Sequence, residues 1–285
     1  MNDMFLRGAV LCLFAAMAWA LAGPAARLCF AEGLDPATVT FWRLFIAGAC
    51  FFIHAAVRRE LVISRRDFGI LALFGMLDVS LVLLCFQVAV EKSGGSLAVI
   101  LMFTAPLWVA LFSRMLYGES LTKPKVAALF IALAGTILIC ASGGSLGGSI
   151  SYLGLACGLL SGLGYALQFI FVAWWKNRYS TAGLFAAMFI PAAAVLAFFA
   201  DFGPTTLLGW AGLIIPSIMC TYTAYYLYGQ SLRCLSPVQA AVIGNVEPVL
   251  AALFSWLIWG ENFTPAGWLG CSFVMASVLI LTLKK

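Results

Sequence analysis

Two acidic residues, Asp78 and Glu247, stand deep inside long apolar segments. An ionised carboxylate is costly at the centre of a bilayer, so such a residue binds a cation, relays a proton or stays protonated in a hydrogen-bonded bundle. Pro248 follows Glu247, and a proline leaves a carbonyl one turn earlier without its helical donor, so a break in the helix is expected beside Glu247. We interpret Asp78 as a contact for a substrate amine and Glu247 as a coupling residue. A purely structural carboxyl is the alternative for each.

A basic side chain and several aromatic rings complete the candidate site. Arg43 lies within an apolar segment, where a guanidinium needs a carboxylate or carbonyl partner, or extends toward the interface. Aromatic faces can hold a cation or stack on a ring, with ordinary core packing as the alternative. The expected substrate-binding residues are Trp19, Asp78, Tyr165, Gln168, Asn245 and Tyr222, and the expected coupling or gating residues are Glu247, Pro248, Pro106 and Arg43.

The composition determines the class of protein that must position these residues. Of 285 residues, 64% are hydrophobic and only 9% are charged. So few charges cannot cover the surface of a water-soluble protein of this size. The chain is therefore expected to be an all-α integral membrane protein.

Residues for metal or cofactor chemistry are sparse. The nine cysteines are scattered and His54 is the single histidine, so no zinc site and no cofactor are expected. Gly143–Gly147 matches GxSxG, but it lies on a Gly/Ser connector, whereas a nucleophile elbow needs a turn between a strand and a helix. Asn262 begins a glycosylation sequon, but in a very short loop. Neither motif is taken as a functional site. The sequence contains neither HExxH nor a nucleotide-binding loop, and its net charge of +5 is too dispersed for nucleic acid. An enzyme is not expected.

Apolar segments of about 20 residues, the length that spans a bilayer, occur ten times. They are Leu6–Phe30, Pro36–Val57, Asp67–Val90, Gly95–Tyr117, Thr122–Ala141, Ser151–Trp175, Ser180–Ala200, Leu207–Ser231, Pro237–Trp259 and Thr264–Leu283. Short connectors separate them and leave no room for a soluble domain. Ten transmembrane helices are predicted.

Lysine and arginine set the orientation, because cytoplasmic loops carry the excess of both. With the N-terminus inside, the outer side holds only Arg27 and Lys92. The cytoplasmic side holds Arg7, Arg58, Arg59, Arg65, Arg66, Arg114, Lys123, Lys125, Lys176, Arg178, Arg233, Lys284 and Lys285. Both termini are therefore predicted to face the cytoplasm.

The chain resembles itself at a shift of about 142 residues. Residues 109–113 align with 251–255, Pro106 meets Pro248, and Gly118-Glu119 meets Gly260-Glu261. At a shift of 146, Trp19 meets Tyr165. Two repeats, 1–145 and 146–285, then hold five spans each, and an odd number inserts the second copy upside down. Such inverted repeats are typical of secondary transporters, whose substrate site lies near the membrane midplane between the halves.

These paired motifs resemble the drug/metabolite transporter superfamily, specifically its ten-helix EamA branch. Thr104-Ala105-Pro106 with Gly118-Glu119 matches it, as do Glu247-Pro248, Phe41-Trp42-Arg43 and Leu235-Ser236-Pro237. The resemblance implies a 5+5 inverted bundle in a bacterial inner membrane that moves small metabolites, commonly amino acids and often outward. It also implies that a monomer suffices for a full pathway, while an oligomer stays possible.

The sequence thus predicts a carrier that works by alternating access. Amino acid export is the leading hypothesis, and the aromatic content favours aromatic or hydrophobic amino acids. Uptake of a cation such as choline is the alternative within transporters. An integral-membrane enzyme or a lipid scramblase is the alternative from another class. Substrate, direction, coupling ion and oligomeric state stay open at this stage.

Overall fold

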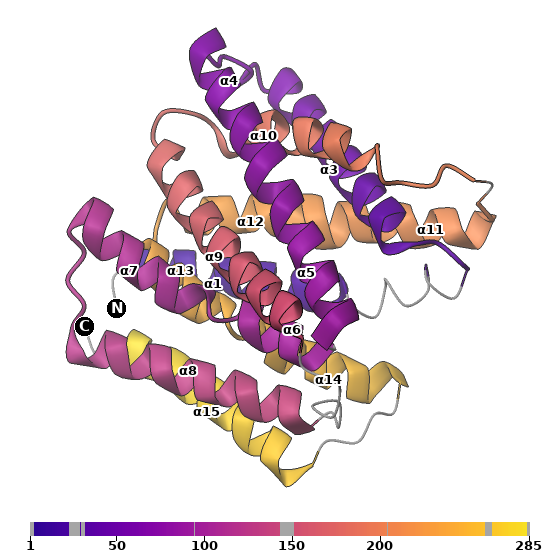
Figure 1. Ribbon diagram of the computed structural model, residues 1–285. Helices are drawn as coiled ribbons and strands as arrows, with labels where there is room; N and C mark the ends of the chain where they lie inside the picture. The colour runs from indigo at the N-terminus through magenta and orange to yellow at the C-terminus, as the bar shows by residue number, and fades with distance from the viewer. Residues whose placement is uncertain are drawn as a thin grey trace.

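The computed structural model describes residues 3–22, 29, 32–93, 95–142, 151–203, 205–259 and 264–283. Within these ranges the regular secondary structure is entirely helical (Figure 1). The first part of the chain forms α1 (Asp3–Ala20), α3 (Pro36–Val57), α4 (Arg65–Phe74), the π-helix η1 (Gly75–Val79), α5 (Ser80–Ser93), α6 (Gly95–Met102), α7 (Ala105–Tyr117) and α8 (Lys123–Ser142). The second part forms α9 (Tyr152–Trp175), α10 (Thr181–Leu196), α11 (Leu207–Pro216), the π-helix η2 (Ser217–Thr223), α12 (Ala224–Ser231), α13 (Pro237–Gly244), α14 (Glu247–Trp259) and α15 (Pro265–Leu283).

Several helices begin at a side chain that accepts the first free backbone N–H groups, as N-cap residues do. Asp35 caps α3, Ser180 caps α10 and Thr206 caps α11. Ser236 caps α13 in a reciprocal arrangement with Gln239, and Pro237 occupies the first turn. The sequence thus marks these helix starts with short polar residues directly before apolar runs.

Eight helical stretches of the described chain are long and apolar enough to span a membrane, when the π-segments and short breaks are counted with the helices they interrupt. They coincide with eight of the ten predicted segments. The other two, α10 and residues 265–281 of α15, are apolar helices but shorter. Large apolar side chains such as Phe14, Leu77 and Phe130 lie exposed on the outside of the bundle, as expected of surfaces that contact lipid.

The helix boundaries repeat along the chain. Gly75 begins η1 and Ser217 begins η2, 142 positions later. The same shift relates the starts of α4 and α11, α6 and α13, α7 and α14, and α8 and α15. Helix α6 is separated from α7 at Phe103-Thr104, and α13 from α14 at Asn245-Val246, so the two interrupted helices are broken at matching points.

Packing follows the same pattern. Helix α8 lies along α15 at the lower edge of Figure 1, and α3 packs against α10. Each of these pairs joins the corresponding helices of the two parts of the chain. Likewise η1 packs on α10 and α9, while η2 packs on α3 and α1.

Glycines allow the closest of these contacts, because small residues let helix backbones approach. A Cβ on Gly75 would overlap the carbonyl oxygen of Met188 in α10. A Cβ on Gly135 in α8 would lie 2.7 Å from the carbonyl oxygen of Gly270 in α15. Gly158 and Gly162, four residues apart in α9, pack against Leu101.

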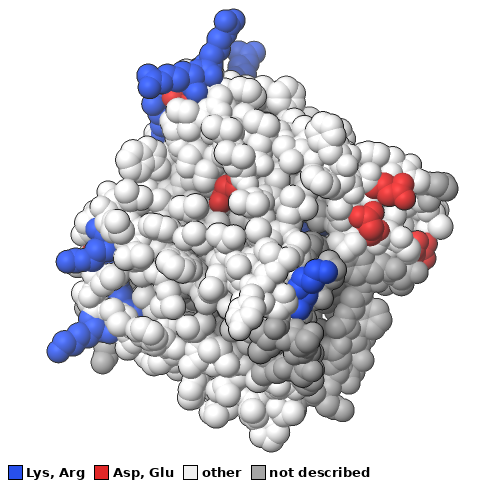
Figure 2. Space-filling view, in the orientation of Figure 1, with Lys and Arg blue, Asp and Glu red and all other residues white. Residues whose placement is uncertain are grey.

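Charge separates the two ends of the bundle. Figure 2 shows basic side chains gathered at the top and left, near α4 and α7. Acidic side chains gather at the right edge, over α11. The middle of this face carries few charged side chains, which matches an apolar belt between two aqueous ends.

Candidate functional site

Asp78 lies in η1, between α4 and α5. Its Oδ2 atom is buried and has no hydrogen-bond partner among the described residues, while the Gln168 side chain of α9 is the hydrogen-bonding group beside the carboxyl. A Cβ on Gly164 would lie 3.0 Å from Asp78 Oδ1, so the lack of a side chain at residue 164 lets the carboxyl lie close to the α9 backbone. π-Turns recur at functional sites because they distort the regular hydrogen-bond ladder. The structure therefore brings Asp78 and Gln168 together and leaves one carboxylate oxygen available.

The matching π-helix of the second part faces Arg43. The Arg43 Nε donates to Thr221 Oγ1 in η2 at 3.2 Å. Glu247, at the start of α14, lies within electrostatic range of Arg43, and Tyr225 lies within range of Arg43, Glu247 and Asp78. The opposite charges of Arg43 and Glu247 thus share one region of the bundle interior.

Aromatic rings form one wall of this region. Trp19 of α1 packs edge-on against Tyr225, with ring centroids 5.2 Å apart, and also contacts Tyr228 at 5.5 Å. Tyr165 contacts Phe169 at 5.4 Å and lies within electrostatic range of Glu247. Tyr228 is buried, and its hydroxyl makes no hydrogen bond to the part of the chain that the structure describes. Trp19 and Tyr165 therefore border the same interior region, although the described ring contacts do not join them directly.

Two residues of the expected substrate set bond to other side chains of the bundle. Tyr222 lies toward the last turn of α3, where its hydroxyl is 2.8 Å from His54 Nδ1 and its ring contacts Phe51. Asn245 sits at the break between α13 and α14, and its Nδ2 donates to Thr136 Oγ1 of α8 at 3.3 Å. The structure thus gives Tyr222 and Asn245 hydrogen-bonding partners within the bundle.

Pro106 and Pro248 each occupy the second position of the helix that follows a break. Because proline cannot donate a backbone hydrogen bond, it is tolerated in the first turn of a helix, where that donor would be unused. The structure breaks the ninth span at Asn245-Val246, directly before Glu247-Pro248. The equivalent break before Pro106 shows that both parts of the chain use the same device.

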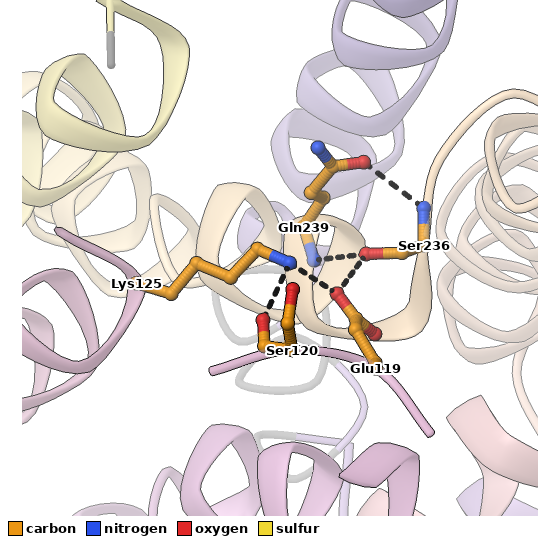
Figure 3. Close-up of polar contacts among 5 residues, drawn as sticks. All are labelled: Glu119, Ser120, Lys125, Ser236 and Gln239. Carbon is orange, nitrogen blue, oxygen red and sulfur yellow. Dashed lines mark hydrogen bonds and ion pairs between the residues drawn. The ribbon is translucent and has the colours of Figure 1, made fainter. Parts of the chain in front are cut away.

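A polar cluster that the sequence analysis did not assign to the site joins α7, α8 and α13 (Figure 3). Lys125 Nζ contacts Glu119 Oε1 at 2.8 Å, and the Ser236 hydroxyl donates to the same oxygen at 2.7 Å. Gln239 Oε1 accepts from the backbone N–H of Ser236 at 3.0 Å. We call Glu119, Lys125, Ser236 and Gln239 the Glu119 cluster. Its sequence signal was present, since Gly118-Glu119 and Leu235-Ser236-Pro237 are two of the paired motifs, but their contact was not predicted.

A second polar cluster joins the start of α4 to the connection between α9 and α10. Arg178 Nη2 forms an ion pair of 2.9 Å with Asp67 Oδ2, and the Tyr179 hydroxyl donates to the same carboxylate. The guanidinium also lies 5.6 Å from the ring centroids of Trp175 and Tyr179. Charged groups at this end thus tie together segments from both parts of the chain.

Some sequence predictions fall outside the described residues. They concern Arg27, Gly143–Gly147, the boundary between 145 and 146, Gly260, Glu261, Asn262, Lys284 and Lys285. Within the described residues, no group of three or more His, Cys, Asp or Glu side chains could hold a metal ion.

Comparison of the sequence with known protein families shows which family the chain belongs to. The sequence profile of the EamA-like transporter family matches residues 6–141 and again 152–283. The chain belongs to the EamA-like transporter family. It is thus a multi-pass membrane transporter of the drug/metabolite transporter superfamily, and the resemblance drawn from the paired motifs is confirmed.

Curated relatives carry the same description. The chain is 26% identical to an "Uncharacterized inner membrane transporter YicL" of Salmonella typhimurium, over 98% of this chain and 96% of the relative. It is 27% identical to an "Uncharacterized transporter" of Archaeoglobus fulgidus, over 87% of each chain. A solved crystal structure shares the fold with a TM-score of 0.84 at 18% identity, and the match covers 97% of this chain and 96% of the other.

Proposed function

We propose that this EamA-family transporter exports amino acids across the cytoplasmic membrane by alternating access, with aromatic or hydrophobic amino acids favoured. The observation that carries the proposal is the buried Asp78 carboxyl, whose Oδ2 lacks a hydrogen-bond partner within the described residues. An ammonium group would supply that partner. The rings of Trp19 and Tyr225 border the same interior region and suit an apolar or aromatic side chain.

The proposed architecture is a ten-span bundle of two inverted repeats, 1–145 and 146–285, with both termini in the cytoplasm. Helix boundaries that recur at 142 residues support it, as does the separation of basic and acidic ends. The name of the Salmonella relative supports an inner-membrane location. One chain supplies both halves of the site, so a monomer suffices for the pathway.

In this proposal, Glu247 and Arg43 form the coupling pair. Glu247 begins α14 directly after the helix break, so its exposure can change when α13 and α14 move relative to each other. Arg43 reaches η2 through Thr221 and lies within electrostatic range of Glu247. A proton on Glu247 would remove the attraction to Arg43 and so favour a different arrangement of these helices.

Reconstitution in proteoliposomes tests the proposal, with a panel of labelled amino acids and choline measured with and without a pH gradient. Gradient-dependent flux of amino acids is expected. Flux of choline alone would favour the cation carrier, and hydrolysis or lipid movement without solute flux would favour an enzyme or a scramblase.

Variants then separate the roles of the two carboxyls. Asp78→Asn should weaken substrate binding, whereas Asp201→Asn at the outer end of the bundle should leave it unchanged. Glu247→Gln should keep substrate exchange but lose accumulation against a gradient. If Glu247→Gln still accumulates substrate against its gradient with the wild-type pH dependence, Glu247 is not the coupling residue.

The aromatic wall has its own matched pair of variants. Trp19→Ala and Tyr165→Ala should each change substrate affinity at normal expression. Trp256→Ala and Trp268→Ala should not, because those two rings lie at the surface, 44% and 48% exposed. Equal effects from both pairs would contradict the proposed aromatic site.

A further inference from the structure

We propose that a cavity at the basic end of the bundle is an entry vestibule that binds the ammonium and carboxylate groups of an α-amino acid before the central site does. The inference rests on the proposed function for the direction of loading. The binding itself is argued from the residues that line the cavity.

The cavity measures about 460 Å³, within the usual range for small-molecule sites. Three segments line it. Glu60 and Val62 come from the connection after α3, residues 177–182 from the connection into α10, and Tyr226, Gln230 and Arg233 from α12 and its end. The first segment belongs to one part of the chain and the other two belong to the second, so a ligand here would contact both.

Two of the lining charges are available and opposite in sign. Arg178 is already paired with Asp67. Arg233 uses one Nη2 contact, at 2.9 Å, on the carbonyl oxygen of Tyr179, and it forms no ion pair with any described residue. Glu60, across the described chain, likewise has no ion-pair partner. Among the described residues, a cation and an anion that each lack an ion-pair partner thus line the same cavity, and together they match a zwitterion better than a phosphate or a simple amine.

The start of α10 strengthens the carboxylate end. Thr181 and Ala182 form its first turn and line the cavity, and the first N–H groups of a helix lack intrahelical partners. The Ser180 hydroxyl accepts only from the N–H of Gly183. Backbone donors and the positive end of the helix dipole therefore lie beside Arg233 at the same cavity, an arrangement that attracts anions.

Polar side chains continue inward from this cavity. Gln230 and Tyr226 line it, and Tyr222 follows at the same four-residue spacing along one face of α12 and η2. His54 of α3 contacts both tyrosines, with Nδ1 2.8 Å from the Tyr222 hydroxyl and its ring 5.0 Å from that of Tyr226. Thr221, which binds Arg43, comes next to Tyr222. This polar series leads from the vestibule toward Arg43 and Glu247, which explains a lone histidine in an apolar helix.

A binding experiment tests the vestibule without requiring transport. The exposed lining residue Asn177 is replaced (Asn177→Cys) in a cysteine-depleted chain in nanodiscs, and the thiol carries an environment-sensitive fluorophore. L-Phenylalanine should change the fluorescence saturably. Phenethylamine lacks the carboxylate and 3-phenylpropionate lacks the ammonium, so each should bind roughly tenfold more weakly, the effect of losing one charge-assisted contact.

Charge variants assign the two ends of the ligand. Arg233→Gln and Glu60→Gln should each weaken the phenylalanine response roughly tenfold. Arg58→Gln removes a nearby exposed charge that does not line the cavity and should leave the response unchanged. All three alter exposed side chains, and an unchanged melting temperature would verify that they fold.

The outcomes separate this inference from the proposed function. No response to phenylalanine, or an equal response to 3-phenylpropionate, overturns the vestibule even if amino acids are transported. A response that needs Arg233 and Glu60, in a chain that transports no amino acid, supports the vestibule and contradicts the proposed function. In a transporting chain, Arg233→Gln should raise KM for substrate offered at the basic end only, and equal KM increases from both sides would also overturn the vestibule.

Discussion

The Ser236 hydroxyl donates a hydrogen bond of 2.7 Å to Oε1 of Glu119, 117 positions earlier in the chain. Ser236 caps α13, and Glu119 follows α7, so the bond joins the start of one interrupted helix to the end of the other. Lys125 holds the same carboxylate oxygen from the other side (Figure 3). The Glu119 cluster therefore ties the two interrupted helices together at one end of the bundle.

Ser236→Ala should destabilise the protein, because it removes both the cap of α13 and the bond to Glu119. The loss of an N-cap alone is worth about 1 kcal/mol, so a lower melting temperature in detergent is expected. Ser120→Ala is the matched control, since only the backbone carbonyl of Ser120 takes part in the cluster. Equal melting temperatures for Ser236→Ala and wild type would show that the Glu119 cluster does not stabilise the protein.

Gly75→Ala should be far more harmful than Gly69→Ala, six residues earlier. The added methyl group on residue 75 would meet the Met188 backbone, which cannot move aside like a flexible side chain. Overpacking of this kind costs about 1–3 kcal/mol or more. Nothing lies within 4 Å of a Cβ at residue 69, where alanine should be neutral or slightly stabilising. Thermal unfolding of the two variants checks the difference, and equal effects would contradict the close contact of η1 with α10.

Thiol labelling should place the Arg58–Arg66 connection in the cytoplasm. In a cysteine-depleted chain, Val62→Cys should react with an impermeant reagent only after the membrane is opened, because basic residues surround it. Leu207→Cys, at the start of α11, should react from outside intact cells. Both residues are exposed, 81% and 89%, so access to the reagent is not limited by burial. Outside labelling at residue 62 would reverse the proposed orientation.

Asp35 should make the stability of the α3 cap depend on pH. Burial alone would raise the pKa of the Asp35 carboxyl, but hydrogen bonds from the Thr38 hydroxyl and the backbone N–H groups of Thr38 and Ala37 outweigh it, so the pKa lies below its usual value. A lowered folded-state pKa contributes stability above the unfolded-state pKa of about 3.9, and this contribution is lost as the pH falls through the folded-state value. Asp35→Asn should therefore flatten the acid side of the melting-temperature profile. A variant profile parallel to that of wild type would contradict this role.

Hydropathy alone predicted most of the fold, because a bilayer requires long apolar helices. Eight predicted segments are membrane-length helices, and the break beside Pro248 followed from the inability of proline to donate a backbone bond. The two π-helices were not predicted, since an extra residue in a helical turn leaves no compositional trace. The cost of burying a charge pointed to Asp78, Arg43 and Glu247, all three of which lie within electrostatic range of Tyr225.

Periodicity could not place the polar partners, because every face of these helices is apolar. Tyr222 was expected with the substrate residues, and its hydroxyl lies beside His54, a partner that the sequence did not indicate. The Glu119 cluster depends on two connections that meet only after the bundle forms. Such contacts between distant segments depend on how the helices pack together, and that packing is not encoded in the spacing of residues along one helix.

The wide turns at η1 and η2 have a consequence for how the gene can change length. A π-turn holds one residue more than the α-turn it replaces, and one residue corresponds to about 100° of rotation about the helix axis. Deleting a single residue from Gly75–Val79 would return the wide turn to an α-turn and leave α4 and α5 nearly in register, whereas a deletion within α4 or α5 would rotate the flanking faces by about 100°. Ser217–Thr223 would absorb a deletion between α11 and α12 in the same way. Single-codon deletions should thus be better tolerated in these two π-helices than in the α-helices beside them.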